Sequence, residues 1–150
     1  MDETLQEYFG GDAVAANMGM RIVELAPGHA IIEMPVDERH LNGMGIAHGA
    51  ALFALADFCH AVASNAAGRV AVAIRCGISY FKAVQPGDLL TATGTERHAG
   101  GHIAEYDINI RNGAGDLVAS MQGMVYRKKD TIAQALEARR AAERSGKNPT

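Results

Sequence analysis

The sequence lacks several features that would place it in a large functional class. It has no excess of basic residues, because 14 lysines and arginines face 17 aspartates and glutamates for a formal net charge of −3. A chain with this balance has no basic field to attract nucleic acid or an anionic membrane. It has only two cysteines and no C-x-x-C spacing, which indicates free thiols in a reducing cytoplasm.

Long apolar runs are also missing. The only candidate, residues 48–66, is interrupted by His48, Asp57 and His60 and does not reach the ~18 apolar residues that span a bilayer. The first residues, MDETLQEYFGGD, lack the positive and apolar regions of a secretory signal. We therefore expect a soluble, cytoplasmic protein with a single domain over residues 1–150, long enough to bury about two-thirds of its unfolded surface.

The period of the hydrophobic pattern predicts the elements. Residues 1–18 favour an N-terminal helical segment, and residues 20–36 favour a β-hairpin around the turn dipeptide Pro27-Gly28. One long apolar helix is predicted near residues 48–65. Residues 130–150 are predicted to form a C-terminal helix, charged nearly all round, and a frayed tail.

Between the two later helices the residues alternate, as they do in strands. The predicted strands lie near residues 72–80, 89–98, 102–111 and 117–128. In the first of them, one face is predicted to carry Val72, Ile74, Cys76, Ile78 and Tyr80. The pattern predicts an α+β fold with a five- or six-stranded antiparallel sheet. One helix covers only part of such a sheet and leaves an edge unpaired, so we also expect self-association.

The stretch LNGMGIAHGAALFALAD carries a family resemblance. It resembles the phenylacetate-degradation-type acyl-coenzyme A thioesterases, with an Asn-Gly loop, a His-Gly pair entering a helix, and an aspartate eight residues later. The resemblance extends from residue 20 to residue 126. It implies the hotdog fold, in which a long curved antiparallel sheet wraps around one central helix. The sequence departs from the family pattern at Ala50, where a second glycine is common, and at Phe58, where a small or hydroxylated residue is common.

The resemblance implies that Gly49 and Asp57 carry the chemistry of thioester hydrolysis. A backbone N–H in the first turn of a helix is unpaired and lies at the positive end of the helix dipole, so Gly49 suits the carbonyl oxygen as it becomes negative. The Asp57 carboxylate suits attack on the carbon or on a water proton. Eight residues of helix separate the two groups by about 12 Å, which predicts a site shared between two antiparallel copies in a homodimer or homotetramer.

Further roles follow from the same resemblance. Asn42 is predicted to orient the water or the thioester, and His48 to fix the loop or the substrate. Residues that we expect to line the substrate site are Ala50, Phe53, Phe58, Ser64 and Lys82. Arg75, Lys82 and Arg97 are the basic residues best placed for the phosphates of coenzyme A, which belongs to the substrate, so that no cofactor is predicted.

Other titratable residues are interpreted as structural. His60 follows Asp57 by three residues, and we expect it to be half-buried and hydrogen-bonded at an interface. His98 and His102 flank a tight turn and are expected to be solvated, so no metal is predicted. Two alternatives to hydrolysis stay open. One is a hotdog dehydratase acting on enoyl or 3-hydroxyacyl thioesters, with His48 as its only obvious histidine, and the other is a non-catalytic acyl-coenzyme A-binding module.

Overall fold

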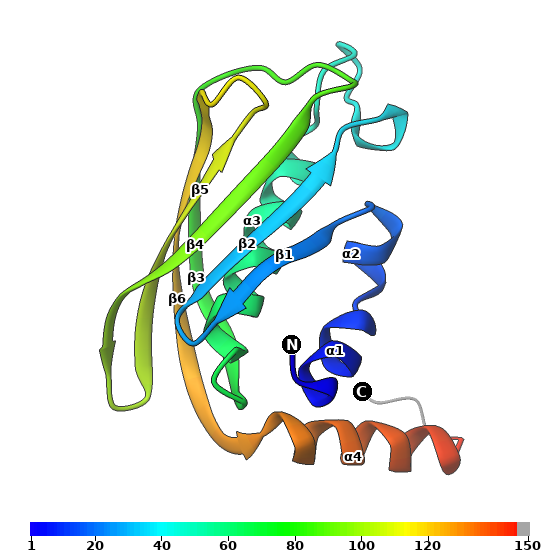
Figure 1. Ribbon diagram of the computed structural model, residues 1–150, viewed down its shortest axis with the longest axis vertical. Coiled ribbons are helices and arrows are strands. Elements are labelled where there is room, and N and C mark those ends of the chain that lie inside the picture. The colour runs from blue at the N-terminus through cyan, green and yellow to red at the C-terminus, as the bar shows by residue number, and fades with distance from the viewer. Residues whose placement is uncertain (147–150) are drawn as a thin grey trace.

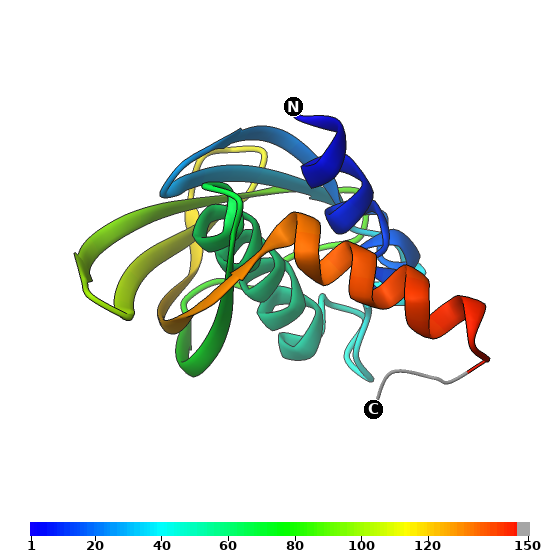
Figure 2. The same ribbon diagram turned by 90° about the horizontal axis from the view of Figure 1, so that it is seen from below.

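The computed structural model describes residues 1–146, and the last four residues of the predicted tail lie outside the described part. A single six-stranded antiparallel sheet, in the order β1-β2-β4-β5-β6-β3, curves around one long helix (Figures 1 and 2). The strands are β1 Arg21–Ala26, β2 His29–Pro35, β3 Arg69–Tyr80, β4 Leu89–Gly100, β5 Ile103–Arg111 and β6 Leu117–Thr131. The helices are α1 Glu3–Gly10, α2 Ala13–Asn17, α3 Gly49–Asn65 and α4 Ile132–Arg144, with a 3-10 turn at Glu38–His40.

The central helix α3 forms because residues 49–65 are almost all apolar or small and because its first turn is capped. Side chains from α3 and from the concave face of the sheet make one core, in which Leu55, Cys59, Ile108 and Met121 have no exposed surface. The alternation in β5 is regular, since every second residue from Ala104 to Ile110 is buried. The predicted elements and the α+β class are confirmed.

The end of α3 is fastened to the start of β3 by one buried amide. Asn65 Nδ2 donates to the carbonyls of Ala61 (2.9 Å) and Ala71 (3.1 Å), and its Oδ1 accepts from the Ala71 amide (2.8 Å). A buried amide that uses both donor and acceptor groups stabilises the reversal of the chain without leaving a polar group unpaired. This contact fixes the position at which β3 begins relative to the helix.

The face predicted for β3 was wrong in its first half. A β-bulge lies between Ala73 and Arg75, so that Ile74 is an extra residue opposite β6. Because side chains alternate between the two faces, one extra residue reverses the faces on either side of it. Val72 is therefore paired with the exposed Tyr126 on the outer face, whereas Cys76 is paired with Gly123 and turns toward α3.

The C-terminal helix α4 is more amphipathic than its charge suggested. Ile132 and Leu136 are buried, and Arg140 forms an ion pair with Glu7 of α1. Helices α1 and α4 lie together at one end of the sheet (Figure 1). The interpretation of α4 as charged nearly all round missed this buried stripe, because two apolar residues four positions apart suffice to dock a helix of this length.

Candidate active site

The entrance of α3 presents an unused backbone donor. His48 is the N-cap residue, and its Nδ1 accepts from the Ala50 amide at 2.9 Å, while its carbonyl accepts from the amides of Ala51 and Leu52. Within residues 1–146 the Gly49 amide donates to no acceptor. A free N–H at the start of a 17-residue helix is a favourable place for a developing negative charge.

A tyrosine from the sheet packs closely against Gly49. The Tyr80 hydroxyl donates to the Gly49 carbonyl at 3.0 Å, and its ring lies so close that a Cβ at residue 49 would be 3.3 Å from Cζ. Larger side chains would displace the ring or push the helix outward. The sequence pattern did not single out Tyr80, although it is the side chain that positions the predicted oxyanion donor.

An apolar hollow of about 360 Å³ adjoins this donor. It is lined by Ile46, Ala47, Gly49, Leu52, Tyr80, Phe81, Lys82, Ala83 and Val84. Lys82 thus lies beside the helix entrance, and it forms an ion pair with Asp116. Phe81, which also lines this hollow, is 60% exposed, an unusually large exposure for an aromatic side chain.

The Asn42 side chain closes its own loop. Its Oδ1 accepts from the amides of Met44 (2.9 Å) and Ile46 (3.4 Å). That contact uses the carbonyl half of the amide, and its Nδ2 donates to no partner among the residues that the structure describes. The donor half of Asn42 remains available at the approach to α3.

Asp57 lies about two turns beyond Gly49 on α3, beside Cys76 of β3. It is partly exposed, and none of the ion pairs found among residues 1–146 includes it. Partial burial, and then the negative charge of Asp12, raise the pKa of the Asp57 carboxyl above its usual value. A carboxylate shifted in this direction is a better proton acceptor near neutral pH than an ordinary surface aspartate.

The side chains of Cys76 and His60 lie beside Asp57. The Cys76 thiol is 4.0 Å from Asp57 Oδ1 and 3.8 Å from His60 Nδ1. His60 was expected to be half-buried, but it is 1% exposed, and its Nε2 has no hydrogen-bond partner in the described chain. Burial lowers the pKa of His60 to about 4, so the ring is neutral at pH 7.

The remaining predicted substrate residues are spread over three places. Ala50 is exposed and Phe53 half-buried on α3, whereas Phe58 is buried against Phe9 of α1. Ser64 lines a different hollow of about 300 Å³ at the far end of α3. The structure of one chain therefore does not bring the five residues into one pocket.

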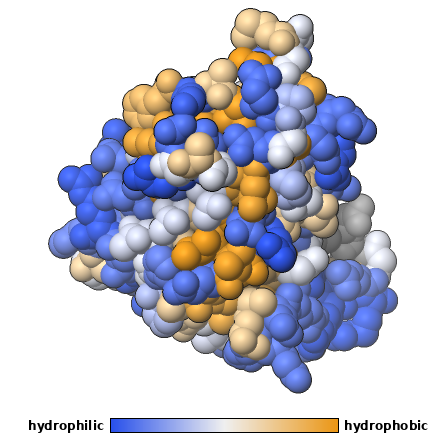
Figure 3. Space-filling model, turned by 45° about the horizontal axis from the view of Figure 1, so that its top comes forward, coloured by the Kyte–Doolittle hydropathy of each residue, from blue (hydrophilic) through white to orange (hydrophobic). Residues whose placement is uncertain are grey.

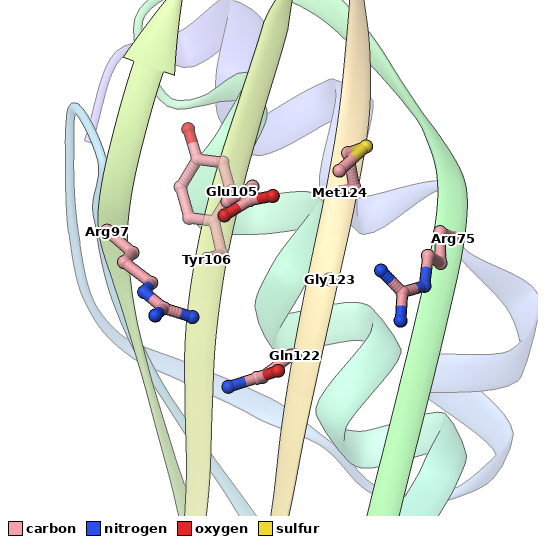
Figure 4. A pocket seen from close by; sticks show the side chains of 7 residues that line it. All are labelled: Arg75, Arg97, Glu105, Tyr106, Gln122, Gly123 and Met124. Atoms are coloured by element: carbon pink, nitrogen blue, oxygen red, sulfur yellow. The ribbon is translucent and has the colours of Figure 1, made fainter.

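Two of the basic residues proposed for the coenzyme A phosphates meet on the outer face of the sheet. Figure 4 shows Arg75 of β3 and Arg97 of β4 reaching toward each other across β5 and β6, with Gln122 between them. The hollow that they border has a volume of about 180 Å³ and includes Glu105. It lies on the side of the sheet opposite α3.

Neither His98 nor His102 belongs to a group of three potential metal donors among the described residues. His102 Nδ1 lies 3.1 Å from the Arg127 carbonyl, and its ring stacks on Tyr126. Over residues 1–146, one group of three potential metal donors lies within 4.8 Å, and it consists of Asp57, His60 and Cys76.

The fold and the helix-entrance site define a hotdog thioesterase, and comparison with known proteins supports this class. Residues 44–119 match the model of the Thioesterase superfamily. The chain is 39% identical over 124 residues to the acyl-coenzyme A thioesterase PaaI of Escherichia coli K12, covering 83% of this chain and 89% of that protein.

Two solved structures agree with this assignment. The structure of the E. coli PaaI protein superposes with a TM-score of 0.83 at 36% identity, covering 86% of this chain and 94% of that one. A hypothetical thioesterase protein with coenzyme A from Streptococcus pneumoniae TIGR4 gives a TM-score of 0.77 at 28% identity, with coverage of 82% and 96%. The chain belongs to the thioesterase superfamily and, within it, to the phenylacetate-degradation type of acyl-coenzyme A thioesterase.

Proposed function

We propose that the protein hydrolyses acyl-coenzyme A thioesters, with aryl or medium-chain acyl groups, to the free acid and coenzyme A. The observation that carries this proposal is the unpaired Gly49 amide at the head of α3, beside an apolar hollow, in a chain that also keeps an unpaired carboxylate at Asp57. Family membership and the coenzyme A named for one structural neighbour support the same substrate class.

In this reaction the thioester carbonyl oxygen accepts a hydrogen bond from the Gly49 N–H, and this bond stabilises the negative charge of the tetrahedral intermediate. Asp57 either removes a proton from the attacking water or attacks the carbonyl carbon itself. The C–S bond then breaks, and coenzyme A leaves as a thiolate that takes up a proton. When water is the nucleophile, the free acid is released at this step. When Asp57 is the nucleophile, an acyl–Asp57 anhydride is left, and a water molecule hydrolyses it to the free acid and the Asp57 carboxylate. No cofactor takes part in these steps, because coenzyme A belongs to the substrate.

The two groups cannot serve one thioester within a single chain, since eight residues of α-helix separate them by about 12 Å. We therefore infer that the working unit is a homodimer, or a homotetramer built from dimers, with Gly49 of one copy facing Asp57 of the other. The exposed apolar side chains of the edge strand β3 and the residues after it support a second copy on that side: they are Val72, Ile74, Tyr80 and Phe81.

Figure 3 shows another face of the molecule, on which orange apolar patches reach the surface between hydrophilic residues.

Within the described residues no helix is both long and apolar enough to cross a bilayer. Both cysteines are free, which supports a reducing compartment such as the cytoplasm as the site of action.

A panel of aryl and medium-chain acyl-coenzyme A esters, followed by release of free thiol, tests the activity. Asp57→Asn keeps the shape of the side chain and is expected to lower kcat by about 10²–10⁴-fold. Asp107→Asn makes the same chemical change on β5 and is expected to leave kcat unchanged. Full activity of Asp57→Asn contradicts the proposal.

The oxyanion role of Gly49 can be separated from its size. Gly49→Pro removes the amide hydrogen at the first helical position, where proline is tolerated, and the preceding His48 already has the extended conformation that proline requires (φ −66°, ψ 139°). Gly49→Ala adds a Cβ but keeps the N–H. We expect the proline variant alone to lose about 10²–10³-fold in kcat.

Mixing the two inactive variants tests the shared site. When Asp57→Asn and Gly49→Pro chains are unfolded together and refolded in equal amounts, half of the dimers are mixed and each has one intact site. Activity should therefore return to about one quarter of the wild-type value by the symmetry of a twofold dimer. No recovery in refolded mixed dimers would show that both groups come from the same chain.

The dehydratase alternative has less support. Its only candidate histidine, His48, uses Nδ1 to cap α3, and the described chain places no carboxylate beside it in a hydrogen bond or ion pair. Hydration of an enoyl thioester without thiol release would favour that reaction, and binding without turnover would favour the non-catalytic module.

A further inference from the structure

Three side chains with different donor atoms converge between α3 and the edge strand β3. Asp57 contributes a carboxylate oxygen, His60 an imidazole nitrogen and Cys76 a sulfur, and the three atoms lie within 4.8 Å of one another. The first two are three residues apart and so share one face of the helix. The third reaches them because the β-bulge turns Cys76 toward the helix.

The spacing of these atoms suits a cation better than direct hydrogen bonds. The thiol is 3.8 Å from His60 Nδ1 and 4.0 Å from Asp57 Oδ1, at the long limit for hydrogen bonds that involve sulfur. In a tetrahedral zinc site, Zn–S bonds of about 2.3 Å and Zn–N or Zn–O bonds of about 2.0–2.2 Å place the ligand atoms about 3.5–3.6 Å apart. Shifts of a few tenths of an ångström would bring the sulfur within that range of both partners.

The histidine is held in position and its ligand atom is available. Gly123 leaves room for the ring, because a Cβ there would lie 2.5 Å from Cε1, and Tyr106 packs against the ring at a centroid distance of 5.3 Å. Since Nε2 has no partner in the described chain, no hydrogen bond forces the proton onto Nδ1. Nδ1 can therefore offer its lone pair to a cation without losing a strong contact.

The charge around the cluster also favours a cation. Asp57 forms no ion pair within residues 1–146, and the charge that raises the pKa of its carboxyl, after burial, is that of another carboxylate, Asp12. Sulfur and imidazole nitrogen are ligands that thiophilic divalent metals prefer over Mg²⁺ or Ca²⁺. Two anionic ligands, a carboxylate and a thiolate, would balance the charge of one such ion.

We propose that Asp57, His60 and Cys76 form a binding site for one thiophilic divalent cation, for which Zn²⁺ is the expected ion. Occupation of this site inhibits the enzyme. Binding releases the Cys76 thiol proton to solvent and forms a metal–thiolate bond, with solvent as the fourth ligand. Inhibition rests on the proposed function, because the metal engages the carboxylate that hydrolysis requires.

Metal binding can be measured without substrate. The reduced, full-length protein is freed of metal with a chelator, and Co²⁺ is then added while the absorption spectrum is recorded. A thiolate-to-cobalt charge-transfer band, together with the intense visible bands of tetrahedral Co²⁺, is the expected result at one ion per chain. Calorimetric titration with ZnCl₂ should give the same stoichiometry and a proton release that depends on the buffer.

Variants assign the ligands. Cys76→Ser should abolish the charge-transfer band and weaken Zn²⁺ binding by more than about tenfold, and His60→Phe should weaken it to a similar extent. Cys59→Ser is the matched control, because Cys59 is buried against the carbonyls of Ala30 and Ala92 and should leave the band intact. Circular dichroism verifies that each variant is folded.

The outcomes separate the two proposals. A band that is absent, or that persists in Cys76→Ser, overturns the metal site even if the protein is an active thioesterase. Zinc binding in a protein that hydrolyses no acyl-coenzyme A ester leaves the metal site standing and contradicts the proposed function. If both hold, Zn²⁺ should inhibit wild-type hydrolysis reversibly, and Cys76→Ser should be at least about tenfold less sensitive.

Discussion

Replacing Gly123 with alanine is expected to destabilise the protein through one contact. The new Cβ would lie 2.5 Å from Cε1 and 2.7 Å from both nitrogens of the His60 ring. Gly123 belongs to β6, which is hydrogen-bonded on both sides, and His60 is buried on α3, so neither can move freely. Overpacking of this kind costs about 1–3 kcal/mol of unfolding free energy.

A second substitution shows whether the cost comes from that ring. In a His60→Ala background the space is empty, and Gly123→Ala should become neutral or stabilising by up to about 1 kcal/mol, because alanine loses less backbone entropy than glycine. Gly77→Ala is the control, since a Cβ at residue 77 would meet nothing within 4 Å.

Urea denaturation of the four members of this double-mutant cycle, at one protein concentration, measures the coupling. A coupling energy of about 1–3 kcal/mol is expected between residues 60 and 123. Equal costs of Gly123→Ala in both backgrounds would refute the close packing of β6 on His60, and with it the placement of that ring beside Asp57.

Three further predictions concern single contacts. Burial lowers the pKa of His60 from 6.5 to about 4, so the unfolded chain takes up a proton first as pH falls. The contribution of His60 to the free energy of unfolding should therefore be constant above pH 6.5 and fall by about 3 kcal/mol toward pH 4. Urea unfolding of His60→Phe should lack that part of the pH dependence. Asn65→Ala strands the amide and carbonyl of Ala71 in the core and should cost about 2–4 kcal/mol, measured by urea denaturation, with a cost below about 1 kcal/mol arguing against those hydrogen bonds. Tyr80→Phe removes the hydrogen bond to the Gly49 carbonyl and should reduce kcat by less than about tenfold while KM changes little; a loss as large as that of Asp57→Asn would give the hydroxyl a chemical role.

The elements could be predicted because their signals are local. The alternation through β4, β5 and β6 and the unbroken apolar helix from Gly49 to Asn65 reflect a face buried in a core, and burial follows directly from the order of residues. The glycine at the helix entrance and the mid-helix aspartate were identified from the family motif. Their separation along one helix was calculable from sequence alone.

The contacts around Asp57 could not be predicted in the same way. Cys76 reaches Asp57 because of a bulge at Ile74, and no residue type marks that bulge in the sequence. The same extra residue places Val72 and Cys76 on opposite faces, whereas regular alternation had predicted one face for both. The roles of Tyr80 and Gly123 likewise depend on contacts that are distant in sequence. Tyr80 contacts Gly49, 31 residues away, and Gly123 contacts His60, 63 residues away.

The bulge in β3 places residues of the same sequence parity on opposite faces of the sheet. Before Ile74, Val72 faces outward opposite Tyr126, and after it Cys76, four residues further on, turns toward the helix. Because Ala73 lies opposite Val125 and Arg75 opposite Met124, deleting Ile74 would leave a regular ladder in which Cys76 still turns toward the helix. Relatives that lack this one residue would therefore keep the same inner lining on a strand that is one residue shorter.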